Sequence, residues 1–135
     1  MNTLLVVLAL VLLGLLVYRF WKPYVQPPKR EVKPNEANLY FFYTNWCGFS
    51  QKAMPEWTKL EESLRRESTF GKTHVTAVSV DCEADRALCT LYDIQGYPTI
   101  LLETKSGVQE FKGRPTYSAL KTFLRESLGQ ERENM

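Results

Sequence analysis

The chain has 135 residues, which is room for one domain of ordinary size and little more. Hydrophobic residues make up 44% of it, enough for a core, and a formal net charge of only +2 gives no reason to expect nucleic acid as a partner. The single histidine argues against a zinc site, because structural sites normally use four Cys or His ligands. We expect no metal and no other cofactor.

Residues 1–21 are predicted to be a transmembrane anchor. The stretch from Met1 to Tyr18 has no charged side chain and is mostly Leu and Val, close to the roughly 20 apolar residues that span a bilayer. Aromatic and basic residues follow at once, as at a membrane interface: Tyr18, Arg19, Phe20, Trp21 and Lys22. A cleaved signal peptide is the competing interpretation, but the uncharged start and the bulky end favour an anchor in the lipid bilayer.

Residues 22–37 are predicted to be an extended, semi-rigid linker, because four prolines lie in them: Pro23, Pro27, Pro28 and Pro34. The basic residues of this region all follow the apolar run, so the positive-inside rule places the following domain in the cytoplasm. That domain is expected over residues 38–129, and residues 130–135 are expected to be a disordered tail.

The first predicted elements of the domain are a strand and a long helix. Leu39–Tyr43 is wholly apolar and aromatic, which is typical of a strand buried on both faces. A helical pattern begins at Gly48, with a kink expected at Pro55. The apolar side of this helix is expected to contain Phe49, Ala53, Met54, Trp57, Leu60 and Leu64.

The second half of the domain alternates again between strands and helices. A strand is predicted over His74–Val80 and a short helix over Arg86–Tyr92. Two strands around Ser106-Gly107 form a predicted hairpin, Thr99–Glu103 and Val108–Lys112, and a helix follows over Pro115–Leu128. The order β-α-β-α-β-β-α predicts an α/β sandwich with a mixed central sheet flanked by helices.

Cys47 is the strongest candidate for chemistry. It lies between a buried strand and the first turn of a helix, where free N–H groups and the helix dipole favour a thiolate. A thiolate there could attack a disulfide and form a mixed disulfide. A buried structural cysteine is the alternative that position alone leaves open. Gly96-Tyr97-Pro98-Thr99 begins the third predicted strand, and Pro98 is compatible with a cis peptide bond.

Several motifs together resemble the thioredoxin superfamily, and protein disulfide isomerase domains most closely. They are FFYTNWCGFS, AMPEW, VSVDC, LYDIQGYPTI and FKGR, in this order between Leu39 and Leu128. The resemblance implies that Cys47 is the nucleophile and that the Tyr97-Pro98 loop pairs with the substrate backbone. We assign substrate contacts to this loop and to the residues around the cysteine, which are Trp46, Gly48 and Phe49.

The chain departs from that family where the second cysteine of Cys-x-x-Cys would lie, because Ser50 is there. A serine hydroxyl cannot displace a substrate from Cys47, so release would need another thiol. Phe41 replaces the family's buried carboxylate, and Phe49 replaces its usual His or Pro. The linker leaves no room for the family's first strand and helix, so the fold is expected to be a reduced thioredoxin-like core.

Cys82 and Cys89 leave several pairings open. The resemblance implies a structural disulfide between them, whereas a cytosolic setting favours two free thiols. A third possibility is that Cys82 resolves the mixed disulfide on Cys47, which would require Cα atoms within about 7 Å.

Two functions are consistent with these residues. The first is a membrane-anchored protein that acts in thiol-disulfide exchange through one cysteine, with cysteine-containing proteins as substrates and glutathione as a candidate thiol for release. The second is a thioredoxin-fold binding or structural module of a membrane, without turnover. The family resemblance suggests a lumenal domain and the charges suggest a cytosolic one, so the side of the membrane is left open.

Overall fold

Two parallel strands lie in the middle of a five-stranded sheet. β1 (Glu36–Tyr43) pairs in parallel with β3 (Thr73–Asp81) and antiparallel with β4 (Thr99–Thr104). With β2 (Thr69–Phe70) and β5 (Gly107–Glu110) the strand order is β2-β3-β1-β4-β5. The structure, a computed structural model, describes residues 2–20 and 31–130. The predicted mixed sheet is confirmed.

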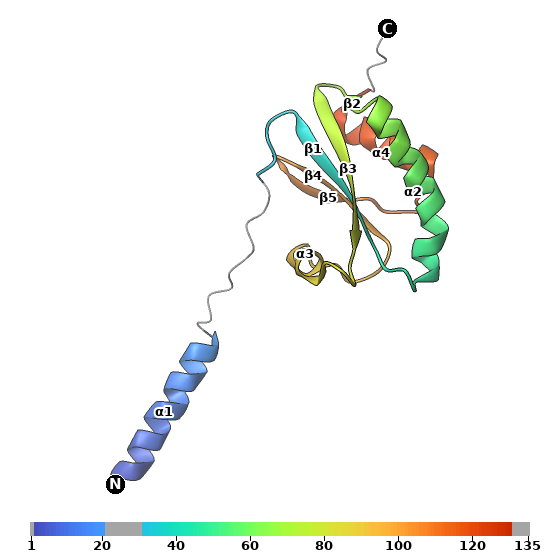
Figure 1. The fold of residues 1–135 in the computed structure, drawn as a ribbon. Helices are drawn as coiled ribbons and strands as arrows, with labels where there is room; N and C mark the ends of the chain where they lie inside the picture. Colours follow the sequence, from blue (N-terminus) through green and yellow to red (C-terminus); the bar gives the residue numbers. More distant parts are fainter. Residues whose placement is uncertain (1, 21–30, 131–135) are drawn as a thin grey trace.

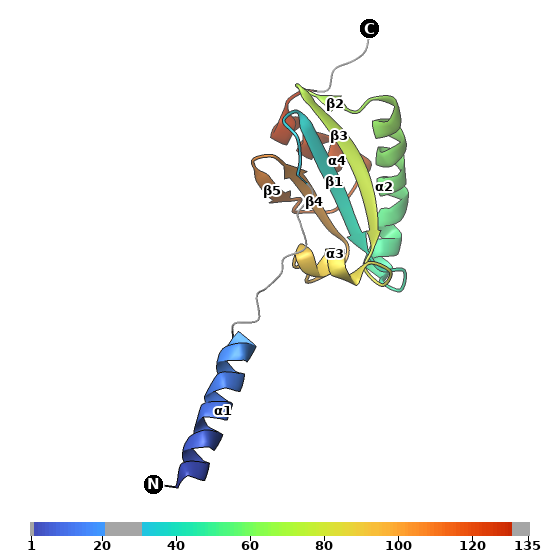
Figure 2. The same cartoon turned by 60° about the vertical axis from the view of Figure 1, so that its left-hand side comes forward.

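Helices cover both faces of this sheet, as Figure 1 shows. α2 (Gly48–Arg66) and α4 (Tyr117–Leu128) share one face, and the short α3 (Arg86–Leu91) lies on the other. In Figure 2 the arrowheads of β1 and β3 point to the same end of the sheet, and α2 begins at that end. The loops that follow these two strands therefore lie close together.

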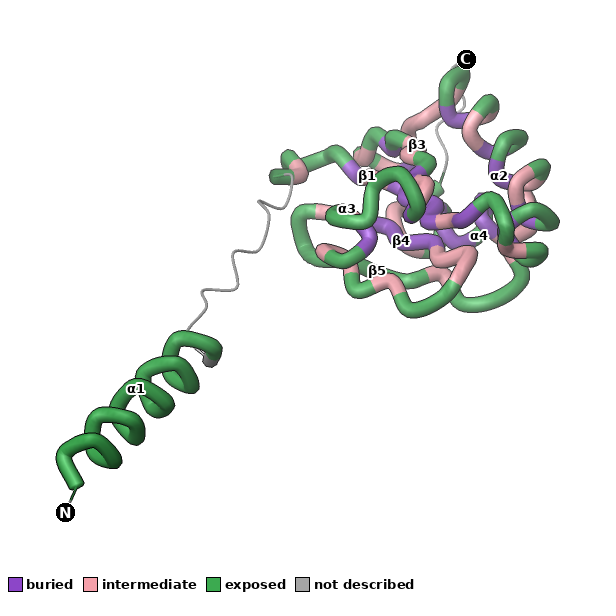
Figure 3. Tube along the Cα trace, turned by 60° about the horizontal axis from the view of Figure 1, so that its bottom comes forward, coloured by how far each residue is buried: buried purple, intermediate pink, exposed green. Residues whose placement is uncertain are grey.

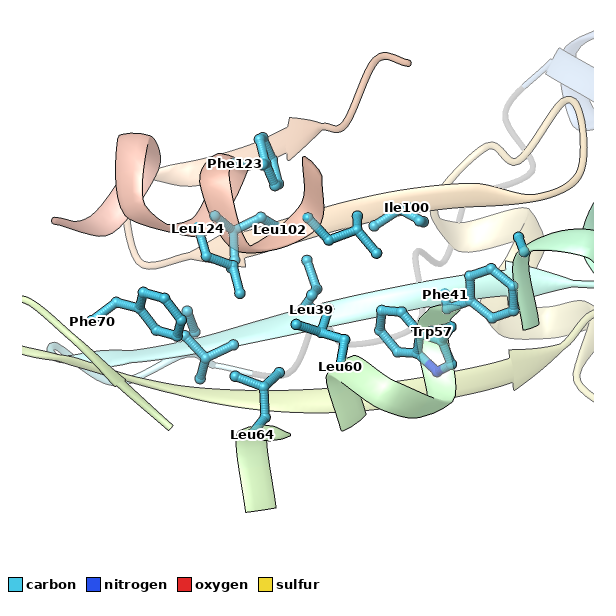
Figure 4. Close-up of a cluster of buried hydrophobic side chains, with 14 residues drawn as sticks. Leu39, Phe41, Trp57, Leu60, Leu64, Phe70, Ile100, Leu102, Phe123 and Leu124 are labelled. Carbon is cyan, nitrogen blue, oxygen red and sulfur yellow. The ribbon is translucent and has the colours of Figure 1, made fainter. Parts of the chain in front are cut away.

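Because β1 contributes side chains to both faces, it builds two cores. Toward α2 and α4, Leu39 and Phe41 are fully buried, and the ring of Phe41 stacks on Trp57 with centroids 5.0 Å apart (Figure 4). Toward α3, Tyr40 and Phe42 pack against the second core, which contains Val80, Cys82, Cys89 and Leu101. The prediction that Leu39–Tyr43 is buried on both faces is confirmed.

All seven predicted elements of the domain are present, with three differences. β2 was not predicted, because two residues carry no recognisable periodicity. β1 begins at Glu36, inside the segment predicted as linker. α2 continues through Pro55 as one helix.

The predicted anchor and linker fall partly outside the described residues. α1 (Thr3–Phe20) has 18 residues, and its described side chains are exposed (Figure 3). Across the described ranges, no helix is long and apolar enough to cross a membrane. Residue 1, residues 21–30 of the linker region and residues 131–135 of the predicted tail lie outside the description. Membrane anchoring therefore stays a prediction.

Candidate functional site

Cys47 lies at the start of α2, just beyond the carboxyl end of β1. It is the N-cap residue of the helix, with extended backbone angles of φ −79° and ψ 118°. Its carbonyl accepts a hydrogen bond from Gln51 N–H at 3.0 Å, so the first turn of the helix forms around it. Its side chain is half-buried, and it is the free cysteine of the described chain.

The surroundings of Cys47 lower the pKa of its thiol. The backbone N–H of Ser50 contributes most, and the N–H of Phe49 and the hydroxyl of Ser50 act in the same direction. Partial removal from water opposes them by raising the pKa. The backbone N–H groups of Phe49 and Ser50 are donors at the N-terminus of the helix, where a negative charge is favoured. The thiolate is therefore stabilised by the position of Cys47 in the fold.

The loop before β4 meets Cys47. The Tyr97-Pro98 peptide bond is cis, and the Cys47 Sγ lies 3.5 Å from the Tyr97 carbonyl oxygen, to which the thiol donates. These residues are 50 positions apart in the sequence. The structure thus brings together the cysteine and the proline loop, as the motifs predicted.

Aromatic side chains surround the cysteine and face solvent. Trp46 is 67% exposed and Phe49 is 74% exposed. The Trp46 ring meets the Tyr97 ring edge-on, with centroids 6.1 Å apart. The placement of Phe49 on the buried side of α2 was wrong, because its side chain is exposed and lines a cleft instead of the core. Gly48 is exposed, and a Cβ there would meet nothing within 4 Å.

The cleft beside Phe49 has a volume of about 630 Å³ and runs between the start of α2 and the segment before α4. Tyr97 and Pro98, to which the sequence assigned substrate contacts, are among its lining residues, and that assignment stays a prediction. Its other lining includes apolar residues (Ala53, Ile100 and Phe111) and the charged residues Lys52, Glu56 and Arg114. The Glu56 carboxylate is already engaged, because it accepts from Tyr117 N–H at 2.8 Å and pairs with Lys59 at 3.1 Å. An extended apolar segment could occupy this cleft.

Ser50 lies on the inner side of the same helical turn. It is 1% exposed, and its Oγ has no conventional hydrogen-bond partner among the described N and O atoms. Its hydroxyl instead acts on the sulfur, as one of the groups that lower the pKa of Cys47. Ser50 can therefore stabilise a thiolate but cannot form a disulfide with it.

At position 41, where the family resemblance implies a buried carboxylate, the structure has an aromatic ring. Phe41 is fully buried between the Trp57 and Tyr43 rings, at centroid distances of 5.0 and 5.5 Å. Within residues 2–20 and 31–130 there is also no group of His, Cys, Asp or Glu that could hold a metal ion. Among the described residues, Cys47 is the free thiol at this site.

Cys82 and Cys89 form a disulfide on the opposite face of the sheet from α2. Their Cα atoms are 5.8 Å apart, and both residues are buried. Of the pairings that the sequence left open, the structure contains the bridge between the end of β3 and α3. Cys82 is therefore not available as a resolving thiol for Cys47 in this state.

Glu103 is a buried polar residue that the sequence did not single out. It is 3% exposed and accepts hydrogen bonds from Tyr40 Oη at 3.2 Å and Tyr92 Oη at 2.8 Å. This network lies under the disulfide face rather than beside Cys47. A glutamate at the end of a predicted strand gives no signal of such burial, because its partners come from other elements.

Comparison with known proteins agrees with this geometry. Residues 28–126 match the Thioredoxin family. The chain belongs to the thioredoxin family. A mitochondrial thioredoxin domain-containing protein of Schizosaccharomyces pombe is 32% identical over 106 residues, which are 74% of this chain and 28% of that protein. Protein disulfide isomerase-like 2-1 of Oryza sativa is 32% identical over 98 residues, or 71% of this chain and 25% of that protein.

Solved structures show the same fold. Human ERp44 superposes with a TM-score of 0.58 at 26% identity, covering 68% of this chain and 27% of that one. The first two thioredoxin domains of Saccharomyces cerevisiae Eps1p give 0.61 at 24% identity, covering 75% and 42%. This thioredoxin-family chain spans about a quarter of the length of the two curated relatives above. Its domain is of the thiol-disulfide oxidoreductase type found in protein disulfide isomerases.

Proposed function

We propose that this chain is a membrane-anchored thiol-disulfide exchange protein that works through Cys47 alone. The observation that carries the proposal is the combination of an activated thiol at the start of α2 with a buried serine three residues later. Disulfide exchange needs a thiolate, an approach for the substrate and a route to release. The lowered pKa of Cys47 supports the first requirement, and the cleft beside Phe49 supports the second. Because Ser50 cannot act as a resolving thiol, release is assigned to a thiol from outside the Cys47–Ser50 motif.

The reaction proceeds in two balanced steps. The Cys47 thiolate attacks one sulfur of a substrate disulfide, forms a mixed disulfide with it and releases the other sulfur as a thiolate, which takes a proton from water. A second thiolate then attacks the substrate sulfur, forms a new disulfide and returns Cys47 as a thiolate. If that thiolate belongs to the same substrate, the result is isomerisation; if it is glutathione, the product is a substrate–glutathione disulfide.

Substrate binding is assigned to the surfaces on either side of the thiol. The cleft beside Phe49 has both apolar and charged lining residues, and the exposed Trp46 ring directly precedes Cys47. The Tyr97 carbonyl already lies within 3.5 Å of the sulfur, so a backbone paired with this loop would bring its own cysteine near Cys47. The expected substrates are cysteine-containing proteins in extended conformation.

The test compares three forms of the 135-residue chain in detergent micelles: wild type, Cys47→Ala and Ser50→Cys. Each is mixed with a peptide disulfide, quenched with an alkylating agent and analysed by mass spectrometry. Wild type should accumulate a peptide adduct on Cys47. Ser50→Cys should show little adduct, because the added thiol displaces the peptide and leaves a bond between residues 47 and 50. Equal adducts in wild type and Cys47→Ala would refute the assignment of the nucleophile.

A binding module without turnover is the second candidate, and the exposed rings of Trp46 and Phe49 favour it. Aromatic residues are common at the centre of protein interfaces. If this function is the correct one, partner binding in cell extracts persists in Cys47→Ala and is lost in a Trp46→Ala, Phe49→Ala double variant. Loss of partners in Cys47→Ala alone supports exchange instead.

We propose further that α1 holds the domain on a membrane. Its Leu and Val side chains are between 41% and 79% exposed, so they are available to contact lipid. The Cys82–Cys89 disulfide favours an oxidising compartment for the domain over the cytosolic side that the charges favour. Alkaline carbonate extraction followed by protease protection tests both statements. Release of the chain from membranes by carbonate would refute the anchor.

A further inference from the structure

One edge of the sheet is open along most of β3. β2 pairs with β3 at Thr73 and His74, where the sheet ends on that side (Figure 2). From Thr76 to Asp81, no described strand lies beside β3 on the side away from β1. Eight of the nine residues of β3, His74–Asp81, therefore pair with β1 on one side, whereas only Thr73 and His74 pair with β2 on the other.

The backbone groups on the open side can be assigned from their neighbours. The N–H groups of His74 and Cys82 donate toward β1, whereas that of Val75 donates the other way, to the carbonyl just before β2. In a parallel pair these directions alternate along the strand. Ala77 and Ser79 therefore direct both N–H and C=O away from β1, and neither backbone has a hydrogen-bond partner in the described part of the chain.

This edge lacks the features that usually prevent strands from pairing. From Thr73 to Asp81 there is no Lys, Arg, Pro or Gly, and five of the nine residues are Val or Thr. The opposite edge differs, because β5 has only four residues, all exposed, and an ion pair between Glu110 and Lys112 lies at its end. Only the β3 edge is long, uncharged in its middle and rich in strand-forming residues.

We propose that two copies of this chain pair antiparallel through their β3 edges, with a two-fold axis at Val78. In this register Ala77 lies opposite Ser79 of the second copy, and Ser79 lies opposite its Ala77. Each pair exchanges two hydrogen bonds, so the four outward groups of Ala77 and Ser79 are all satisfied. Val78 meets its own counterpart, and the two sheets become one of ten strands.

The surroundings select this register and this partner. β2 blocks the edge at one end, and at the other the carbonyl of Asp81 already accepts from Ala84 and Asp85. The open part of the edge between these two ends is residues 76–80, and the same five residues of the second copy lie opposite it in this register. No like charges lie opposite each other. A hollow of about 330 Å³, lined in part by Thr76 and Ala77, borders this edge.

Cysteine crosslinking tests the register in the full chain. Directly opposite residues of a non-hydrogen-bonded pair have Cα atoms about 4.5 Å apart, within the range of a disulfide. Val78→Cys, in a Cys47→Ala background, should therefore form a covalent dimer under mild oxidation in micelles. Thr76→Cys is the matched control, since it lies on the same face of the same strand. Its counterpart lies four residues further along, about 14 Å away at 3.4 Å per residue.

We expect at least tenfold more dimer from Val78→Cys than from Thr76→Cys. Adding Ala77→Pro should abolish the difference, because it removes an outward N–H without removing a bond to β1. Equal crosslinking of the two cysteine variants would overturn the proposal. Sedimentation of the Cys47→Ala chain gives an answer that does not depend on folding defects in the cysteine variants. A dimer fraction that rises with protein concentration supports the proposal. A chain that stays monomeric up to about 100 µM, far above the dissociation constant of a functional dimer, refutes it.

Discussion

Replacing Phe41 with aspartate would put a carboxyl group at the buried position where the family resemblance implies one. Phe41 is 0% exposed and stacks on Trp57, whose indole N–H already donates to Ser79 Oγ at 2.8 Å. Removing the ring should cost about 3–5 kcal/mol, and burying a carboxyl group without a hydrogen-bond partner about 1–3 kcal/mol more. The sum, about 4–8 kcal/mol, approaches the whole stability of an ordinary domain.

Urea unfolding of the full chain in micelles, followed by tryptophan fluorescence, measures this loss. Phe41→Leu is the control, because it keeps most of the apolar volume and should lose less than about 1.5 kcal/mol. Burial raises the pKa of the introduced acid, so the folded state keeps its proton longer than the unfolded state does. The deficit of Phe41→Asp should therefore grow as the pH rises from 4 to 7. A deficit equal to that of Phe41→Leu at pH 7 would refute the reasoning.

Three further changes have expected outcomes. Ser50→Ala removes a hydroxyl that lowers the pKa of Cys47, so the pH profile of iodoacetamide alkylation should move to higher pH; an unmoved profile would show that the hydroxyl does not reach the sulfur. The hydrogen bond from Tyr117 N–H and the nearby Lys59 lower the pKa of Glu56. Wild type should therefore be more stable than Glu56→Gln at neutral pH, and this difference should be lost as the pH falls below about 4. Thermal or urea unfolding at both pH values measures it, and a constant difference would contradict it. Replacing both Cys82 and Cys89 with alanine opens a short loop and should cost about 2–3 kcal/mol in the same unfolding assay, whereas an unchanged midpoint would show that the bridge does not stabilise the fold.

Periodicity in the sequence was sufficient to predict the central elements of the domain. Leu39–Tyr43 has no polar residue, so a strand buried on both faces was the natural interpretation. The start of β1 was missed because Glu36 and Asn38 interrupt that apolar run, and their place in the strand is fixed by pairing with β3 and β4. Pairing across the sheet is a tertiary interaction that no local pattern records.

The residues of the candidate site that lie in motifs could be predicted from the sequence. The burial or exposure of individual side chains could not, because it depends on packing between elements. The family resemblance assigned Cys47 and Tyr97 to one site, and in the structure the Cys47 Sγ lies 3.5 Å from the Tyr97 carbonyl oxygen. Phe49 was misassigned because its spacing matches the apolar stripe of α2, although its side chain lines the cleft and is exposed. The burial of Ser50 and Glu103 depends on neighbours from other elements, so sequence alone could not give it.

The network around Glu103 also determines how the fold responds to alkali. Burial, together with the hydrogen bonds to Tyr40 and Glu103, raises the pKa of the Tyr92 phenol far above its usual value near 10. Above pH 10 the unfolded chain loses this proton while the folded chain keeps it, so the stability of the domain falls as the pH rises further. Unfolding in alkali would then be visible as a sudden gain of tyrosinate absorbance near 295 nm. This absorbance reports the opening of the disulfide face of the sheet, whereas the reactivity of Cys47 on the other face is measured by a separate assay.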